Sequence, residues 1–296
     1  MTDISSPDLA LDSRSLAGAR LRTIARRFFR NRLAVASLLF LALVTLLAVF
    51  APLVAPLSPE AADPAMRLAP PGSPDYLLGG DTQGRDILSR LIWGGRSSLI
   101  ASALPVALAA VLALGLGLLA GFSRGWAVPV IMRGVDILFA FPMILFAIGF
   151  ATAFGPGIGA VAATIVFSAT PYLTRVVYAD VRAERDKEYV EAARALGASR
   201  REILLREILP NVLTPLVVYA TTLIGGMIVF AASLSFIGLG AQPPAADWGR
   251  MASEGAKVLV TGTPHAATVP AALIVLVAMS FNWLGDGLRD ALDPRG

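Results

Sequence analysis

The sequence predicts an all-α membrane protein with six transmembrane helices. Its 296 residues are 56% hydrophobic and only 16% charged, whereas soluble domains are about 25% charged. Six apolar stretches are long enough to cross about 30 Å of hydrocarbon, which takes roughly 20 helical residues each. They lie near residues 33–56, 98–122, 131–154, 157–178, 211–232 and 265–286. The chain has no cysteine and one histidine, His265, so disulfides and cysteine-based metal or thiol sites are excluded.

The distribution of positive charge predicts the orientation of these spans. With the N-terminus placed inside, nineteen of the 25 lysines and arginines fall in segments on the cytoplasmic side. Short cytoplasmic loops carry an excess of such residues. We therefore expect a multi-pass membrane protein with both termini in the cytoplasm.

Residues 1–32 form the predicted cytoplasmic tail. Residues 1–20 lack apolar periodicity and are expected to be disordered. Residues 21–32 place apolar side chains opposite arginines, which predicts an amphipathic helix on the anionic lipid of the inner leaflet. A nucleic-acid partner is disfavoured, because the basic residues do not form one patch. The apolar run at 33–56 is too long for a signal peptide and is interpreted as an uncleaved first span.

A periplasmic loop at 57–97 is expected next. Its first part is rich in proline and cannot be the interior of a helix or sheet. Its second part has the periodicity of an interfacial helix that leads into the second span. The charges there are expected to pair locally, and a substrate-binding role is the weaker alternative: Asp81, Arg85, Asp86 and Arg90.

Small residues and prolines mark the later spans. Four small residues in the second span allow close helix packing: Gly115, Gly117, Ala120 and Gly121. Three prolines predict kinks, which serve either packing or gating: Pro142, Pro171 and Pro215.

Charged residues are absent from the middle of every predicted span. Asp136 and Asp286 lie near inner ends, and His265 lies at an outer end. Ion-coupled carriers need ionisable groups within the membrane, so a secondary transporter is disfavoured. An intramembrane enzyme is also disfavoured, because His265 has no evident catalytic partner.

A polar island at 184–210 interrupts the apolar spans. One helix is expected at 184–196, with Tyr189, Ala192, Ala193 and Leu196 on one face. Gly197 is suited to ending it in the left-handed conformation.

A second helix is expected directly after this turn. Ser199 and Glu202 have the spacing of a capping box that begins it. Pro210 then opens the fifth span, where its missing N–H costs nothing. Such a helix–turn–helix is suited to binding a partner protein. A merely solvated loop would explain the arginines but not these helix signals.

The island resembles the EAA loop of binding-protein-dependent ABC importer permeases. The matching positions are Glu191, Ala192, Ala193, Gly197, Leu209 and Pro210. Glu207 departs from the pattern, because the family often has an aliphatic residue there. Blocks at 79–99, 233–249 and 281–295 are similar to the C-type permease of dipeptide and oligopeptide importers, a pattern shared by nickel and glutathione importers.

This resemblance implies a type I ABC importer permease fold in the bacterial inner membrane, and a set of partners. The core would span residues 98–286, followed by a cytoplasmic C-terminus at 287–296. The partners would be a B-type permease in a heterodimer, two ABC ATPase subunits and a periplasmic substrate-binding protein. The EAA residues would couple the permease to the ATPases, with Glu191 in a polar contact and Gly197 setting the angle between two coupling helices.

The chain itself is expected to be non-catalytic and to bind no cofactor or metal. A Walker A loop needs Gly-Lys-Ser/Thr, but Lys187 follows Asp186 and Lys257 follows Ala256. ATP and Mg would therefore be bound by the partner ATPases. The expected solutes are di- or oligopeptides, with nickel or glutathione as the alternative. A self-contained channel is a further competitor.

Two segments outside the island have open roles. Ser233, Ser235 and Phe236 are candidates for lining the pathway near a periplasmic gate, although the glycines and prolines after them favour the alternative of a rigid turn. Arg289 has helical pair spacing to Asp286 and Asp293, which predicts a structural helix end.

Overall fold

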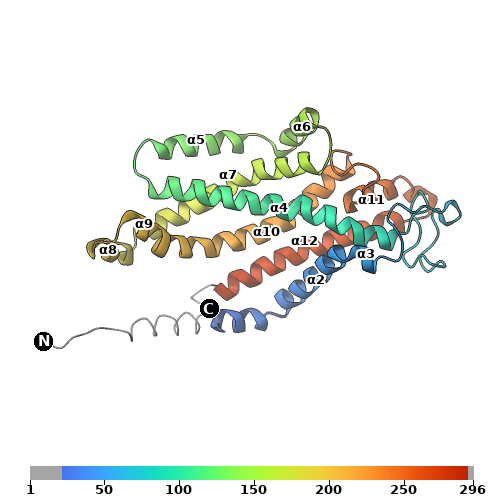
Figure 1. The fold of residues 1–296 in the computed structure, drawn as a ribbon, viewed down its shortest axis with the longest axis horizontal. Coiled ribbons are helices and arrows are strands. Elements are labelled where there is room, and N and C mark those ends of the chain that lie inside the picture. Colours follow the sequence, from blue (N-terminus) through green and yellow to red (C-terminus); the bar gives the residue numbers. More distant parts are fainter. Residues whose placement is uncertain (1–21, 293–296) are drawn as a thin grey trace.

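The protein is a bundle of long helices whose axes run in roughly the same direction (Figure 1). It is seen in a computed structural model that describes residues 22–292. Residues 22–30 are helical, and two short elements, α3 and η1, follow α2. The elements are α2 Arg32–Val49, α3 Ala51–Val54, η1 Pro64–Met66, α4 Ile87–Phe122, α5 Ala127–Ala140, α6 Met143–Phe154, α7 Ile158–Arg185, α8 Glu188–Ala195, α9 Arg200–Glu202, η2 Ile203–Ile208, α10 Leu209–Phe236, α11 Trp248–Ala256, η3 Leu259–Thr261 and α12 His265–Leu292.

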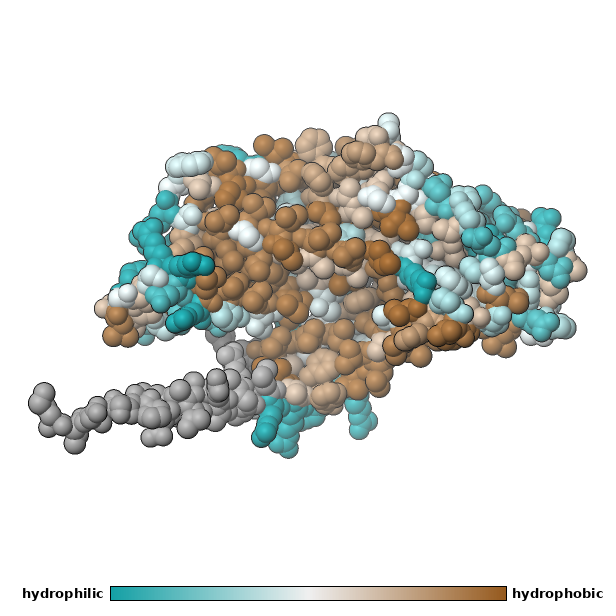
Figure 2. Space-filling view, viewed as in Figure 1, coloured by the Kyte–Doolittle hydropathy of each residue, from teal (hydrophilic) through white to brown (hydrophobic). Residues whose placement is uncertain are grey.

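Within the described residues, five continuous helices and one broken pair are long and apolar enough to cross a membrane. The broken pair is α5 and α6, whose axes differ by 86°. Figure 2 shows a broad apolar band between hydrophilic ends. The prediction of an all-α membrane protein is confirmed, and the described residues contain six apolar spans when the broken pair is counted as one.

The third span was expected as one kinked helix, but the structure breaks it at Pro142. Phe141 has an extended backbone with φ −84° and ψ 129°, and Pro142 is the N-cap of α6. The residue before a proline is disfavoured in the helical region, and proline supplies no N–H to the preceding turn. The break gives α6 a direction of its own. Pro171, in contrast, lies inside the continuous helix α7.

Small residues bring α4 and α7 together. A Cβ added at Gly121 would lie 2.6 Å from Val181, and one at Gly117 would lie 2.5 Å from Val177. The predicted close approach is confirmed at these two glycines. A Cβ added at Gly115 would have no neighbouring atom within 4 Å, so Gly115 takes no part in this contact.

We call the end of the bundle that holds α8 and α9 the inner end, and the opposite end the outer end (Figure 1). The outer end is held by a buried charge cluster, called the outer charge cluster, which we define as Asp81, Arg85, Arg90 and Glu254. Arg85 contacts Asp81 at 2.7 Å and Glu254 at 2.8 Å, and Arg90 pairs with the same two carboxylates. The predicted local pairing is confirmed for Asp81. Asp86 instead caps α4 by accepting from the backbone N–H of Ser89 at 2.8 Å. The amphipathic turn after Asp86 and the second span form one helix, α4.

The helix at 22–30 packs against the inner end of α12. Phe28 is buried, and Ile24 and Phe28 belong to an apolar cluster that includes Ala291. Phe29 is 65% exposed. The predicted amphipathic helix is therefore present in the described part of 21–32, with one aromatic side chain turned inward. Residues 1–20, whose disorder was predicted, lie outside the described residues.

Candidate coupling site and inner cavity

The polar island forms two helices joined by a tight turn. The backbone N–H of Gly197 donates to Arg194 O at 3.1 Å, and that of Ala198 donates to Ala193 O at 3.0 Å. These two bonds are those of a Schellman motif, which satisfies the last carbonyls of a helix. Gly197 has φ +87°, a conformation that L side chains rarely adopt. The predicted glycine stop after α8 is confirmed.

The second helix begins with the predicted capping box. Glu202 N–H donates to Ser199 Oγ at 3.3 Å, and Ser199 N–H donates to Glu202 Oε2 at 2.9 Å. The bonds from the Ser199 backbone and side chain lower the pKa of Glu202 below its usual value. Both residues are exposed. Backbone and capping hydrogen bonds therefore hold the shape of the turn, and its surface stays exposed to solvent.

A π-helical segment, η2, connects this cap to the fifth span. The N–H of Leu209 bonds to Leu204 O, five residues back. Pro210 lies in the first turn of α10, as expected, and the helical backbone also runs without a break from Arg200 to Phe236. Asn211 Nδ2 donates to Glu207 O at 2.8 Å, so a side chain supplies one bond beside the proline. The second coupling helix is thus the first part of the span itself.

Buried aliphatic side chains anchor the two short helices to the bundle. Val190, Ile203 and Ile208 are 0%, 1% and 0% exposed, in a cluster with residues of α4, α7 and α10. The predicted face of α8 is wrong in part, because Tyr189 and Ala193 turn toward this cluster. It is Val190, missed by the sequence pattern, that makes the deepest contact.

The opposite surface of the island is open. Glu191, Ala192 and Gly197 are exposed, and Leu196 is 89% exposed. Of the two residues that close the matched pattern, Leu209 is half-buried and Pro210 is exposed. Glu207, the departure from the family pattern, is half-buried. A carboxylate, a small side chain and a large apolar side chain thus lie together on one solvent-facing turn.

Tyr189 links three elements at this end. Its hydroxyl donates to Glu184 Oε2 of α7 at 2.6 Å and accepts from Asn211 Nδ2 of α10 at 3.1 Å. Burial and the bond to Glu184 raise the pKa of Tyr189 to about 12, so the hydroxyl keeps its proton at neutral pH. No sequence spacing indicated this bridge, because Asn211 lies beyond the second helix.

An inner cavity of about 730 Å³ begins beside this bridge. Glu184 and Asn211 lie on its wall, which continues along α10 and α12 to Thr222 and Asn282. Asp286 and Arg289 also line it, and the ion pairs of the described residues do not include one between them. The predicted Asp286–Arg289 pair is therefore not formed, and Asp293 lies outside the described residues.

The candidate gate residues lie far from this cavity, at the outer end of α10. Ser233 and Phe236 are exposed, whereas Ser235 is 7% exposed and faces Gly240.

Comparison with known proteins agrees with this architecture. Residues 113–295 match the family described as binding-protein-dependent transport system inner membrane component. Residues 20–71 match the N-terminal TM domain of oligopeptide transport permease C.

Relatives match almost the whole chain. The glutathione transport system permease protein GsiD of Pectobacterium atrosepticum is 42% identical over 274 residues, covering 93% of this chain and 91% of that protein. The GsiD of Escherichia coli O6:K15:H31 is 43% identical over 270 residues, covering 91% and 89%.

A solved structure shares the fold. A chain of the MetNI methionine ABC transporter, in an inward-facing conformation, superposes with a TM-score of 0.56 at 20% identity, covering 69% of this chain and 97% of that one. The chain therefore belongs to the inner-membrane permeases of binding-protein-dependent ABC importers, and within them to the C-type permeases of oligopeptide-type systems.

Proposed function

We propose that this permease moves short peptides into the cytoplasm, and that glutathione, itself a tripeptide, is among them. The support is its similarity to oligopeptide permeases over 20–71 and to glutathione permeases over most of the chain. Energy would come from ATP and Mg bound by two partner ATPase subunits. A B-type permease would complete the pathway in a heterodimer, and a periplasmic binding protein would deliver the solute. The chain itself would be non-catalytic.

The observation that carries the proposal is the unbroken path from the open island to the cavity. The second coupling helix continues as α10, and α10 lines the inner cavity. A movement of α8 by a docked ATPase would therefore be carried into α10 through the helix and through the Tyr189–Asn211 bond. Such a rigid coupling suits alternating access, in which packed helices move as units.

Within this mechanism the exposed residues of the island have distinct roles. Glu191 would make a polar contact with the ATPase. The small side chain of Ala192 would allow the backbone of the ATPase to come close. Gly197 would set the angle between α8 and α9, while Leu209 and Pro210 would fix the start of span five. At the outer end, Ser233 and Phe236 are exposed and suit a gate, whereas Ser235 is turned to Gly240.

We also propose that the island and both termini lie in the cytoplasm. The helix at 22–30, the island and the end of α12 lie at the same end of the bundle (Figure 1). That end carries most of the arginines, as the inner side of a membrane protein should.

Uptake by a deletion strain tests the substrate class. Cells lacking this chain, with and without a plasmid copy, would be given radiolabelled dialanine, radiolabelled glutathione or nickel-63. We expect plasmid-dependent uptake of at least one of the two peptides. Plasmid-dependent uptake of nickel alone would contradict the peptide proposal and favour the metal alternative.

A further inference from the structure

The wall of the inner cavity holds two tyrosines, Tyr172 of α7 and Tyr219 of α10. The chain has five tyrosines, and the hydroxyls of Tyr76, Tyr178 and Tyr189 each form a hydrogen bond within the protein. The hydroxyls of Tyr172 and Tyr219 have no partner within residues 22–292, and the two residues are 40% and 38% exposed. Both hydroxyls are therefore available to a molecule in the cavity.

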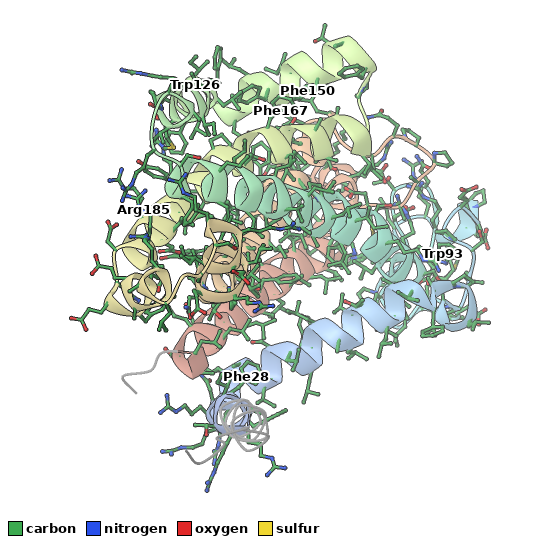
Figure 3. All side chains as sticks on the ribbon, turned by 60° about the vertical axis from the view of Figure 1, so that its left-hand side comes forward. Phe28, Trp93, Trp126, Phe150, Phe167 and Arg185 are labelled. Atoms are coloured by element: carbon green, nitrogen blue, oxygen red, sulfur yellow. The ribbon has the colours of Figure 1, made fainter. Side chains whose placement is uncertain are left out.

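The packing of α7 turns Tyr172 toward the cavity. Phe167 packs on Phe150 of α6, with ring centroids 5.1 Å apart (Figure 3). On the α4 side, a Cβ added at Gly117 would lie 2.5 Å from Val177. Tyr172 lies five residues from both Phe167 and Val177, and five residues bring a side chain about 140° round a helix. Tyr172 is thus on the side of α7 that faces away from α6 and α4 and lines the cavity.

A shared hydrogen-bond partner sets the relative level of α7 and α10. The tyrosine hydroxyl of α8 bonds to both Glu184 of α7 and Asn211 of α10. Twelve residues outward from these two lie Tyr172 and Leu223, about 18 Å along each helix, and both line the cavity. Tyr219 precedes Leu223 by four residues, or about one turn. The two tyrosines therefore lie about one turn apart along the cavity, at its end away from the island.

Helix α12 adds an amide and two charged groups to the same wall. A Cβ added at Gly225 would lie 2.9 Å from Asn282 Oδ1, so Asn282 meets α10 close to this end of the cavity. Asp286 and Arg289 follow at intervals of about one turn. The cavity wall from Asn282 to Leu292 is about 15 Å long, whereas an extended tripeptide spans about 10 Å. The cavity is thus long enough to hold a short peptide.

The tyrosines differ from the polar residues of α12 in what they can select. Those of α12 lie in the block 281–295, whose pattern nickel importers share, so they are not expected to select for peptides. Tyr172 and Tyr219 lie outside the matching blocks. A peptide carries amide groups that donate and accept hydrogen bonds, and a tyrosine hydroxyl does both. Two such hydroxyls suit the main chain of a peptide, whatever its side chains are.

We propose that Tyr172 and Tyr219 are solute-binding residues that hydrogen-bond the main-chain amides of a peptide in the inner cavity. This inference rests on the proposed function, since it takes the solute to be a peptide. Each such hydrogen bond contributes little net binding energy. The peptide can therefore leave the cavity again, as transport requires.

Uptake by the reconstituted importer tests this role. Proteoliposomes with the full complex receive saturating binding protein loaded with radiolabelled trialanine or glutathione. The double variant Tyr172→Phe with Tyr219→Phe keeps both rings and removes both hydroxyls. We expect it to lower uptake at least fivefold, while ATP hydrolysis stimulated by the binding protein changes less than twofold. Tyr178→Phe is the matched control, because Tyr178 is on α7 but does not line the cavity, and its uptake should equal that of the wild type.

The outcomes of this experiment separate the inference from the proposed function. Unchanged uptake in the double variant, or an equal fall in Tyr178→Phe, would overturn the inference alone. A parallel fall of uptake and ATP hydrolysis in an assembled complex would indicate a structural role and also overturn it. Absence of uptake of either peptide by the wild-type complex would contradict the proposed function, and the inference with it.

Protection of a thiol tests peptide binding without transport. The chain has no cysteine, so Gly226→Cys places its single thiol in the cavity. In the solubilised complex, an excess of trialanine should slow the reaction of this thiol with N-ethylmaleimide at least threefold, whereas free alanine, which has no amide bond, should not. Gly134→Cys on α5 is the matched control, because both glycines are exposed and have open space around a Cβ. It should react at the same rate with and without trialanine.

The two tyrosines are then tested in the same assay. Adding Tyr172→Phe and Tyr219→Phe to Gly226→Cys should abolish the protection by trialanine. Protection that persists in this triple variant would overturn the inference, as would equal protection by alanine or no protection in Gly226→Cys alone. The assay needs no transport, so it decides the inference even for a variant that imports nothing.

Discussion

The two polar ends of the molecule use similar residues in opposite ways. At the outer end, the outer charge cluster is buried and its charges pair with one another, with Arg90 1% exposed. At the inner end, the island leaves Glu191 and Ala192 exposed and buries only aliphatic anchors such as Val190. Charges that pair internally hold a loop in place, whereas charges left to solvent are available to a partner protein.

The two ends also differ in how their backbones keep their shape. The outer segment between α3 and α4 has one short helical turn, η1, and is held by bonds between distant parts. Arg85, for instance, reaches Glu254 from 169 positions away. The island is held by local motifs, the Schellman turn at Gly197 and the capping box at Ser199. Outer-end changes should therefore cost stability, and island changes should cost coupling.

The largest expected effect is on stability, from Arg90→Gln. Removing one partner of a buried charge pair costs about 3–5 kcal/mol, because Asp81 and Glu254 lose a shared partner. The exposed Arg194→Gln in α8 is the matched control. Thermal unfolding of the purified importer should show a clearly lower midpoint for the first variant alone. Equal midpoints would show that the outer charge cluster is not a structural clamp.

The next effect is on transport, from Gly197→Val. Valine at φ +87° is strained by about 1–2 kcal/mol, and the turn that joins α8 to α9 must change. We expect uptake to be lost while membrane insertion persists. Gly72→Val in the outer segment is the control, because Gly72 has φ +84° and, like Gly197, open space around a Cβ. Comparable uptake in the two variants would refute the coupling role of Gly197.

A smaller effect is expected from Ser199→Ala. The variant removes the hydroxyl that caps α9. Loss of such a cap lowers helix stability by about 0.5–2 kcal/mol. Uptake should fall severalfold while ATP hydrolysis continues, and Ser199→Thr should restore it. The ratio of solute imported to ATP hydrolysed measures this loss of coupling. An unchanged ratio in Ser199→Ala would show that the cap is dispensable for coupling.

The smallest effect is a pH dependence at Glu254. Burial alone would raise its pKa, but Arg90, Arg250 and Arg85 together hold the pKa below the ordinary value of 4.5. The resulting stability is fully present above pH 4.5 and is lost as the pH falls through the lower folded pKa.

Unfolding midpoints between pH 3 and pH 6 measure this contribution. The wild type should lose more stability in acid than Glu254→Gln does. Glu202→Gln in the exposed capping box is the control, and its pH profile should stay closer to that of the wild type. Identical pH profiles for the wild type and Glu254→Gln would show that the ionised Glu254 does not stabilise the fold.

Local features of the island could be predicted from sequence. Gly197 and the Ser199–Glu202 pair each act within a few residues, so spacing alone identifies them. The apolar spans were predictable for the same reason, because hydropathy is a property of each segment.

Features that depend on distant contacts could not be predicted. The inward turn of Tyr189 depends on Asn211, which lies 22 positions later. The pairing of Arg90 with Glu254 spans 164 positions. Packing between helices, and not local propensity, decides each of these.

The central claim is that the open surface of the island docks on an ATPase subunit, and site-specific cross-linking tests it most directly. A single thiol is introduced by Ala192→Cys, or at the exposed outer residue Leu77 by Leu77→Cys, and a short thiol-reactive cross-linker is added to membranes that contain the whole importer. We predict an adduct between this chain and an ATPase subunit from position 192 and none from position 77. Absence of the ATPase adduct at position 192 in an assembled importer would contradict the claim.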